Sequence, residues 1–220
     1  MSSLNRNTPS QPRIGVLALQ GDFAEHIHML GEIGVHAVEV RKVEQLFEID
    51  GLIIPGGEST TIVKLLMRFE FVDQLRSRVE SGMALWGTCA GMIVIARELA
   101  DSYPTPLNLI DIGVARNHFG RQVDSFEAEI DIEGIDGEAM RAVFIRAPVV
   151  SDVGDGVVKI ASLDDGQAVA VKKGRVLASS FHPELTTDTR MHSLFVELAR
   201  EAQIDTLNPT RNAEEISNTA

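Results

Sequence analysis

The stretch MALWGTCAG, residues 83–91, joins a short apolar run to the pattern Gly-x-Cys-x-Gly. Residues 83–86 are typical of a buried strand, and residues 90–99 are predicted to form the next helix. A cysteine between two glycines at a strand–turn–helix junction is the pattern of a nucleophile elbow. We expect the Cys89 thiol at the helix N-terminus, where the helix dipole favours the thiolate. A buried structural cysteine is the alternative, but the junction favours a nucleophile.

Short apolar runs alternate with amphipathic stretches through the first half of the chain. Residues 14–19, 35–40 and 52–54 are predicted strands, and residues 23–33, 61–69 and 72–81 are predicted helices. Strands that alternate with helices imply a parallel sheet covered on both faces. The expected fold is therefore α/β, a three-layer sandwich with a mostly parallel, mixed central sheet of flavodoxin-like type.

The second half of the chain is richer in predicted strands, which are separated by clusters of Gly and Asp that favour hairpin turns. The predicted strands are 126–132, 142–145, 157–161, 168–171 and 176–180, and a helix is predicted over 190–202. We expect these strands to extend or flank the parallel sheet. One domain is expected over residues 13–204, between disordered polar tails at 1–12 and 205–220.

Composition excludes several classes of function. The 220 residues carry a net charge of −12, which disfavours binding to a phosphate backbone. A single cysteine allows no internal disulfide and fits a reducing cytoplasm. We find no apolar signal core and no run long enough to span a membrane. The sequence also lacks phosphate-loop and dinucleotide motifs and any zinc-binding constellation, so neither a cofactor nor a metal is expected.

A nucleophilic thiol needs a base, and His182 is the strongest of six histidines. It follows an apolar strand and opens His182-Pro183-Glu184. Pro183 biases His182 toward an extended conformation, in which residues two apart point to the same side. Glu184 can then orient the imidazole. An ordinary turn at a strand end is an equally good interpretation of these three residues alone.

The other histidines carry weaker signals. His26, His28 and His192 lie on predicted helices without a carboxylate at a suitable spacing, so we expect surface or core-edge positions. His36 lies near a strand start, and His118 lies in a polar stretch.

A glycine pair follows the predicted strand 52–54, in the stretch PGGEST, residues 55–60. Adjacent glycines let backbone N–H groups approach a ligand closely. Beside a cysteine elbow, this stretch is interpreted as an oxyanion loop, with the N–H groups of Gly57 and Ala90 as donors. Ser59 or Thr60 is expected to cap the next helix.

Taken together, these motifs resemble the class I, triad-type glutamine amidotransferases, and within them the glutaminase subunits of pyridoxal phosphate synthase. The resemblance runs from about residue 14 to residue 198. It is carried by residues 14–21, 55–61, 87–91, 116–117, 120–126, 144–148 and 181–186. The GRQVDSF and FIRAP stretches are the most specific to this family, whereas the cysteine elbow and His-Pro-Glu mark the wider class.

The resemblance implies a catalytic triad of Cys89, His182 and Glu184 and an oxyanion hole formed by Gly57 and Ala90. It also implies a glutamine site, whose residues would be Gly57, Glu58, Ser59, Arg116, Ile145 and Arg146. Arg116 would bind the α-carboxylate of glutamine. Ile145 and Arg146 would contribute mainly through backbone groups.

The implied activity is hydrolysis of L-glutamine to L-glutamate and ammonia. The ammonia would pass to a (β/α)₈-barrel pyridoxal 5'-phosphate synthase subunit, in a large hetero-oligomer in the cytoplasm. Two alternatives stay open. A different cysteine hydrolase, such as an intracellular peptidase, could share the scaffold, because fold does not determine function. A non-catalytic regulatory subunit is the other, and the complete triad argues against it.

Overall fold

The computed structural model describes residues 11–116 and 125–207, and the side chains of these residues as far as 204. Its centre is a seven-stranded sheet with the order β10-β11-β12-β4-β3-β1-β2. The strands are β1 Ile14–Leu17, β2 Ala37–Val40, β3 Gly51–Ile54, β4 Ala84–Thr88, β10 Val158–Ser162, β11 Ala168–Lys173 and β12 Val176–Ser179. Pairing is parallel from β2 to β12 and antiparallel from β12 to β10. The expected mostly parallel, mixed sheet is therefore confirmed.

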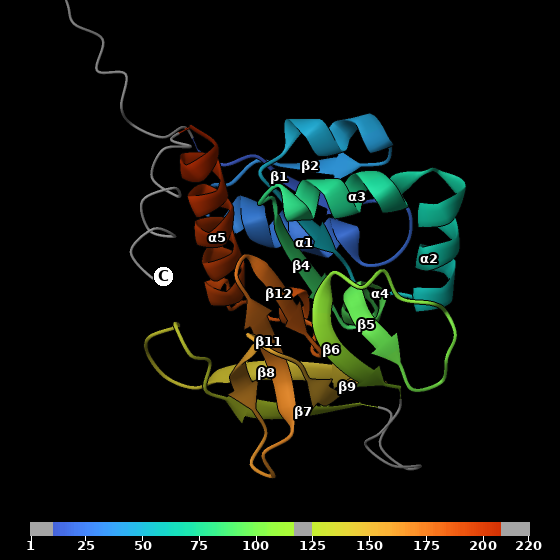
Figure 1. Ribbon diagram of the computed structural model, residues 1–220. Coiled ribbons are helices and arrows are strands. Elements are labelled where there is room, and N and C mark those ends of the chain that lie inside the picture. The colour runs from blue at the N-terminus through green and yellow to red at the C-terminus, as the bar shows by residue number, and fades with distance from the viewer. Residues whose placement is uncertain (1–10, 117–124, 208–220) are drawn as a thin grey trace, which may run out of the picture.

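Helices cover both faces of this sheet (Figure 1). They are α1 Phe23–Glu32, α2 Ser59–Arg68, α3 Phe71–Glu80, α4 Ala90–Ile95 and α5 Arg190–Leu207, with 3-10 turns η1 Val43–Glu48 and η2 Pro183–Leu185. Leu52 and Ile54 of β3 pack in one buried cluster with residues of α2, α3 and α4. Ile53, between them, packs in a second cluster with residues of α1 and α5. This period-two alternation produces the three expected layers.

Two smaller sheets flank the central one. One contains β5 Ala96–Leu99, β6 Ile110–Ala115 and β9 Val149–Val153. The other pairs β7 Ser125–Ile130 with β8 Met140–Ile145 in an antiparallel ladder. Figure 1 shows these sheets below the helical layers, on the side where β12 and β4 end. The strands of the second half thus both extend the central sheet, through β10 and β11, and flank it.

The single helix predicted over residues 90–99 was wrong in its second half. Helix α4 ends at Ile95, and Ala96 turns the chain into strand β5 with φ −58° and ψ 162°. The reason is tertiary: β5 pairs with β6, a distant strand that was not predicted, as β9 also was not. The continuous apolar character of this segment fits a buried helix and a buried strand equally well.

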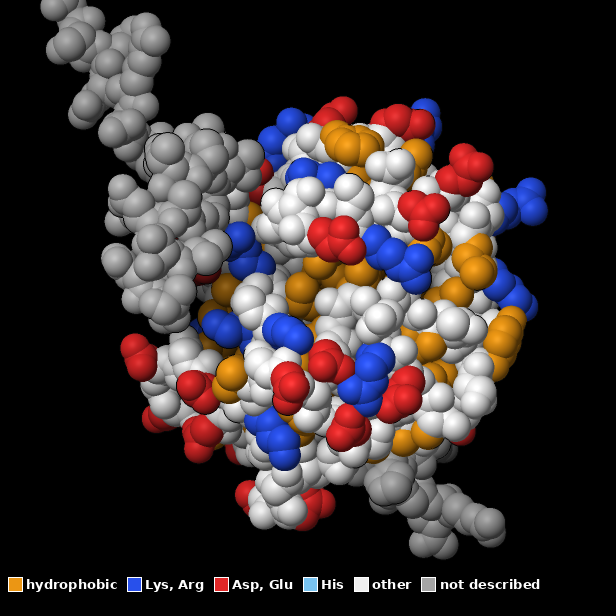
Figure 2. All heavy atoms as spheres, viewed as in Figure 1, with side chains coloured by type: hydrophobic (Ala, Val, Ile, Leu, Met, Phe, Trp, Pro, Cys, Tyr) orange, Lys and Arg blue, Asp and Glu red, His pale blue; other side chains and the backbone are white. Residues whose placement is uncertain are grey.

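Other boundaries differ by a few residues. Strand β2 begins at Ala37 rather than at residue 35, and α5 continues to Leu207 rather than ending at 202. Figure 2 shows acidic and basic side chains intermixed across the visible face. Among the described helices, none has the length and apolar character that crossing a membrane requires.

Candidate active site

The turn between β4 and α4 holds Cys89 in a strained conformation. Cys89 has φ 47° and ψ −105°, in the positive-φ region that non-glycine residues rarely adopt. Gly91 permits the turn, because a Cβ there would lie 2.0 Å from the Ile54 carbonyl oxygen. The N–H of Cys89 donates to the carbonyl of Ser179 over 2.8 Å, which ties the elbow to β12. A strained backbone at a turn of this kind is a recurring feature of functional sites.

Sheet order explains why His182 lies beside this elbow. Strands β4 and β12 are parallel neighbours, with Ser179 in register with Thr88, so Cys89 and His182 both follow strand ends at one edge. The His182 N–H donates to the Val143 carbonyl of β8 over 2.8 Å. A further anchor therefore holds the histidine in place from the flanking sheet.

The Glu184 carboxylate is hydrogen-bonded to the imidazole of His182. His182 Nδ1 lies 2.6 Å from Glu184 Oε1, and the carboxylate has no solvent exposure. Since an ionised carboxylate only accepts hydrogen bonds, Nδ1 is the donor, and Nε2 faces away from Glu184. The extended conformation that was expected does not produce this contact. Instead, Pro183–Leu185 forms a 3-10 turn that begins after His182. Proline fits the first position of such a turn because its missing N–H needs no partner there.

The charge state of His182 suits a thiolate partner. Burial, the largest influence, lowers its pKa, but the hydrogen bonds and charges of Cys89 and Glu184 together raise the pKa to about 10. The imidazole is thus protonated at neutral pH. An imidazolium beside Cys89 stabilises the thiolate and can later donate a proton to a leaving amine.

The loop between β3 and α2 passes directly beside the imidazole. A Cβ on Gly56 would lie 2.5 Å from His182 Cε1, and Gly57 has φ 144°, a region suited to glycine. Ala90 opens α4, so its N–H has no partner within the helix. Both expected oxyanion donors therefore belong to segments that border the elbow.

Gln20 is a neighbour of this loop for which no role was predicted. Its Oε1 accepts a hydrogen bond from the Glu58 N–H over 2.9 Å. A Cβ on Gly57 would come within 2.6 Å of the same oxygen. Gln20 therefore supports the loop backbone from the end of β1, a relation that only the sheet order creates.

Helix α2 is capped by Glu58, and the expected cap by Ser59 or Thr60 was wrong. The Glu58 carboxylate accepts from the Thr60 N–H over 2.9 Å and from the Thr61 N–H over 2.6 Å. Although burial raises the pKa of Glu58, the hydrogen bonds from Thr61 and Thr60 outweigh it and lower the pKa to about 2. The carboxylate is thus ionised and committed to the helix end, where the dipole also favours it.

Because Glu58 serves as the cap, the Ser59 hydroxyl is available to Arg116. Arg116 Nη2 donates to Ser59 Oγ over 2.7 Å, although the two are 57 residues apart in sequence. Arg116 directly follows β6. The structure therefore brings together two of the expected glutamine-binding residues, one at the start of α2 and one after β6.

Ile145 is the last residue of β8, and Arg146 follows it, on another side of the elbow. Cys89 Sγ lies 3.9 Å from the Ile145 carbonyl oxygen. Arg146 has φ 44° and an exposed side chain. The expectation of backbone contacts from this segment stays a prediction, while His118 and the stretch 117–124 lie outside the described residues.

The expectation of surface or core-edge positions was wrong for His26 and His192. Both side chains are fully buried, and His26 Nε2 lies 3.4 Å from Glu184 Oε2. A signal for His26 was present, because Met29 and Leu30, at positions i+3 and i+4, share its buried helix face. His28 and His36 are exposed.

Asp22, His182 and Glu184 present ligand atoms within 4.8 Å of one another, which invites comparison with a metal site. The 2.6 Å between His182 Nδ1 and Glu184 Oε1 is a hydrogen-bond distance. Two ligands of one zinc ion, each about 2 Å from it, would lie roughly 3 Å apart. The distance between His182 Nδ1 and Glu184 Oε1 is therefore that of a hydrogen bond and not that of two ligands of one metal ion.

A three-layer α/β sandwich with a cysteine elbow and a His–Glu pair at one sheet edge defines a class I glutamine amidotransferase fold. The model of the SNO glutamine amidotransferase family matches residues 16–201. The chain belongs to the SNO glutamine amidotransferase family, and the resemblance found from its motifs is confirmed.

Relatives and a solved structure agree with this assignment. The chain is 55% identical over 190 residues to "Pyridoxal 5'-phosphate synthase subunit PdxT" of Dehalococcoides mccartyi, covering 86% of this chain and 97% of the relative. It is 52% identical over 200 residues to the protein of the same name in Nocardia farcinica, covering 88% of each. A crystal structure described as a glutamine amidotransferase superposes with a TM-score of 0.81 at 50% identity, covering 84% of this chain and 98% of the other.

Proposed function

We propose that this chain hydrolyses L-glutamine to L-glutamate and ammonia through Cys89, His182 and Glu184. The observation that carries the proposal is the 2.6 Å hydrogen bond between His182 and Glu184 beside the strained Cys89. A nucleophile, a base within reach of it and a group that orients the base are what acyl transfer requires. Family membership supports the amide of glutamine as the substrate.

In the first half of the reaction, the Cys89 thiolate attacks the carboxamide carbon and a C–S bond forms. The N–H groups of Gly57 and Ala90 stabilise the negative oxygen that develops. His182 gives a proton from Nε2 to the nitrogen, the C–N bond breaks, and ammonia leaves. The product of this half is a thioester of Cys89 with the glutamyl group.

In the second half, the neutral His182 accepts a proton from water, whose oxygen attacks the thioester carbon. The C–S bond breaks, glutamate leaves, and the thiolate and imidazolium are restored. Glu184 keeps Nδ1 protonated throughout, so that Nε2 exchanges the proton in both halves.

Recognition of glutamine is assigned to the polar groups around the elbow. Arg116 is held at the start of α2 by Ser59, and its guanidinium would bind the substrate α-carboxylate in a charge-assisted pair. Gly57, Glu58, Ile145 and Arg146 would supply further contacts. Because the Glu58 carboxylate caps α2, the contact expected from Glu58 would not come from this carboxylate.

The ammonia is proposed to pass to a (β/α)₈-barrel synthase subunit that makes pyridoxal 5'-phosphate, within a cytoplasmic hetero-oligomer. The name of the 55% identical relative, a pyridoxal 5'-phosphate synthase subunit, supports this partner. The chemistry supports a closed transfer, since ammonia in neutral water is mostly protonated and no longer nucleophilic. An enclosed path would preserve it.

The deciding experiment measures glutamate release from glutamine by the chain, with and without the synthase, for wild type and Cys89→Ala. Release by the wild type and none by the variant is the expected result. Cleavage of a peptide library without glutamine hydrolysis would instead indicate the cysteine peptidase alternative. Binding to the synthase without any hydrolysis would indicate a regulatory subunit.

A further inference from the structure

Only one oxygen of the Glu184 carboxylate is used by His182. Oε1 accepts from His182 Nδ1, while Oε2 is buried and makes no hydrogen bond with any of the described residues. The polar atom facing it is His26 Nε2, at 3.4 Å, and both side chains have no solvent exposure. A buried carboxylate oxygen requires a donor, because an unsatisfied charged acceptor is costly.

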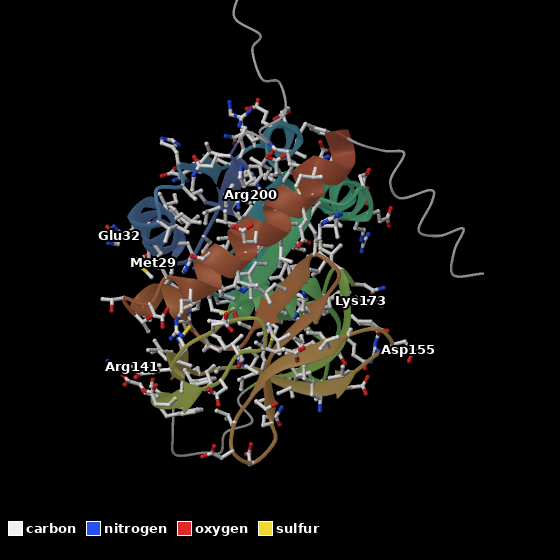
Figure 3. All side chains as sticks on the ribbon, turned by 90° about the vertical axis from the view of Figure 1, so that its left-hand side faces the viewer. Met29, Glu32, Arg141, Asp155, Lys173 and Arg200 are labelled. Carbon is white, nitrogen blue, oxygen red and sulfur yellow. The ribbon has the colours of Figure 1, made fainter. Side chains whose placement is uncertain are left out.

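His26 is itself part of a buried chain of polar groups. Its Nδ1 lies 3.0 Å from His192 Nε2, and its Nε2 lies 3.1 Å from Thr88 Oγ1. Trp86 packs edge-on against both imidazoles, with ring centroids 5.7 Å from His26 and 5.1 Å from His192. The chain links α1, β4 and α5 behind the elbow, and Figure 3 shows α1, which carries Met29, beside the start of α5.

Both imidazoles are neutral. Burial, reinforced by His192 and His182, lowers the pKa of His26 well below its ordinary value of 6.5, and burial lowers the pKa of His192 to about 4. Each ring therefore carries a single N–H, and each bond in the chain has a definite donor.

The groups that surround His26 and His192 favour one arrangement of the protons on the two rings. If His192 Nε2–H donates to His26 Nδ1, the proton of His26 is on Nε2 and faces Glu184 and Thr88. In the reverse arrangement, the Thr88 hydroxyl could serve His26 Nε2. However, the lone pair of Nε2 would then face the carboxylate. A buried N–H on His192 Nδ1 would also lack an acceptor among the described residues. In the first arrangement, only the lone pair of His192 Nδ1 lacks a partner among the described residues. The first arrangement is therefore favoured over the reverse one.

We propose that His26 is a positioning residue of the active site, whose Nε2–H holds Glu184 Oε2 and whose tautomer is set by His192. The inference rests on the proposed glutaminase function and deepens it. Through Glu184, His26 would control the orientation of the His182 ring. The 3.4 Å between His26 Nε2 and Glu184 Oε2 is compatible with this role. In the absence of substrate, the hydrogen bonds of an active site are often longer than in the substrate complex.

A donor on Oε2 also keeps Glu184 ionised. Burial is the largest influence on this carboxyl and raises its pKa, and the negative charge of Asp22 raises it further, whereas His182 lowers it. Removal of the His26 donor would favour the protonated form, which cannot accept from His182 Nδ1. The acidic limb of the rate profile would consequently move to higher pH.

The test compares His26→Phe, which keeps a flat ring without a donor, with His26→Gln, whose amide N–H can reach Glu184. The matched control is His28→Phe, an exposed position on the same helix. Glutamate release is measured with the synthase present, over a range of pH and glutamine concentration. We expect His26→Phe to lower kcat about ten- to hundred-fold with KM unchanged and the acidic limb shifted upward. His26→Gln should recover most of kcat, and His28→Phe should match wild type.

Equal losses in His26→Phe and His26→Gln, or a wild-type kcat and pH profile in His26→Phe, would overturn the inference. Activity in Cys89→Ala would instead overturn the proposed function. A second measurement needs no variant: ¹⁵N chemical shifts of histidine-labelled wild type distinguish protonated from unprotonated ring nitrogens. We expect the His26 proton on Nε2, and a proton on Nδ1 would contradict the proposal even if His26→Phe failed to fold.

Discussion

His182 Nδ1 lies 2.6 Å from Glu184 Oε1, and a 3-10 turn rather than an extended segment produces this contact. The turn places a fully buried carboxylate against one side of the imidazole and leaves the other side free for Cys89. It also raises the pKa of His182 together with the Cys89 contact, against the effect of burial. The orientation and the pKa of His182 therefore depend on Cys89 and Glu184, and each of these residues can be replaced separately.

Cys89→Ala is expected to abolish glutamine hydrolysis, lowering kcat roughly 10⁴-fold or more, because no covalent intermediate can form. Cys89→Ser should be similarly inactive. A glutamine-analogue electrophile should label one site in wild type and none in Cys89→Ala, as read by mass spectrometry. Unchanged circular dichroism would separate lost chemistry from lost fold, and retained activity in Cys89→Ala would falsify the triad assignment.

His182→Asn is expected to approach the loss seen at Cys89, because both proton transfers pass through this ring. Glu184→Gln should cost less, on the order of a hundred-fold in kcat, because an orienting group is partly replaceable. Steady-state rates of glutamate release measure both effects. The assignment of the base would be wrong if His118 proved essential and His182 dispensable.

The pH dependence of wild type follows from the raised pKa of His182, about 10. The imidazolium that protonates leaving ammonia is present below this value and is lost as pH rises through it. We expect kcat/KM, which reports the free enzyme, to fall as pH rises through about 10. A descending limb centred near pH 6.5, the pKa of an unperturbed imidazole, would contradict this result.

Glu58→Ala is expected to lower the free energy of unfolding by about 1 kcal/mol, because it removes the cap of α2. The pKa of Glu58 is lowered to about 2, from the ordinary 4.5, so its contribution is full above pH 4.5 and is lost as pH falls towards 2. Urea unfolding at several pH values measures the loss in the free energy of unfolding and its dependence on pH. Glu70→Ala is the control, since Glu70 precedes α3 without a side-chain cap bond, and an equal loss there would contradict the cap.

Arg116→Lys is expected to raise KM for glutamine about ten-fold or more, because a lysine cannot reproduce a bidentate contact to a carboxylate. It would also weaken the contact to Ser59 that holds the side chain at the start of α2. Initial rates against glutamine concentration measure KM. Arg68→Lys, at the far end of α2, serves as the matched control, and equal KM values in the two variants would argue against a substrate contact.

The isolated chain is expected to be nearly inactive, and addition of the (β/α)₈-barrel synthase should raise glutamate release. The reason proposed is that docking orders the loop at Gly56 and Gly57, so that the Gly57 N–H points at the oxyanion. Ammonium salt should support the synthase without this chain. Full activity in the isolated chain would refute the switch, and failure of the two proteins to associate in sedimentation would refute the partner.

The sequence determined by itself the features that depend on near neighbours in the chain. Apolar periodicity set most of the β/α alternation, and the Gly-x-Cys-x-Gly pattern set the elbow, because only small residues allow that turn. The Cys89 conformation, with φ 47°, agrees with this local reasoning. The cysteine elbow and His-Pro-Glu indicated the wider class, and the GRQVDSF and FIRAP stretches indicated the family, because each motif is read within a few residues.

Tertiary structure alone decided which distant groups meet. The Arg116–Ser59 contact and the burial of His26 against Glu184 depend on strand order and helix packing, which periodicity does not encode. The end of α4 at Ile95 was decided by the pairing of β5 with β6. The contact of Arg116 with Ser59 and that of His26 with Glu184 each join residues more than 50 positions apart, so local sequence patterns do not predict them.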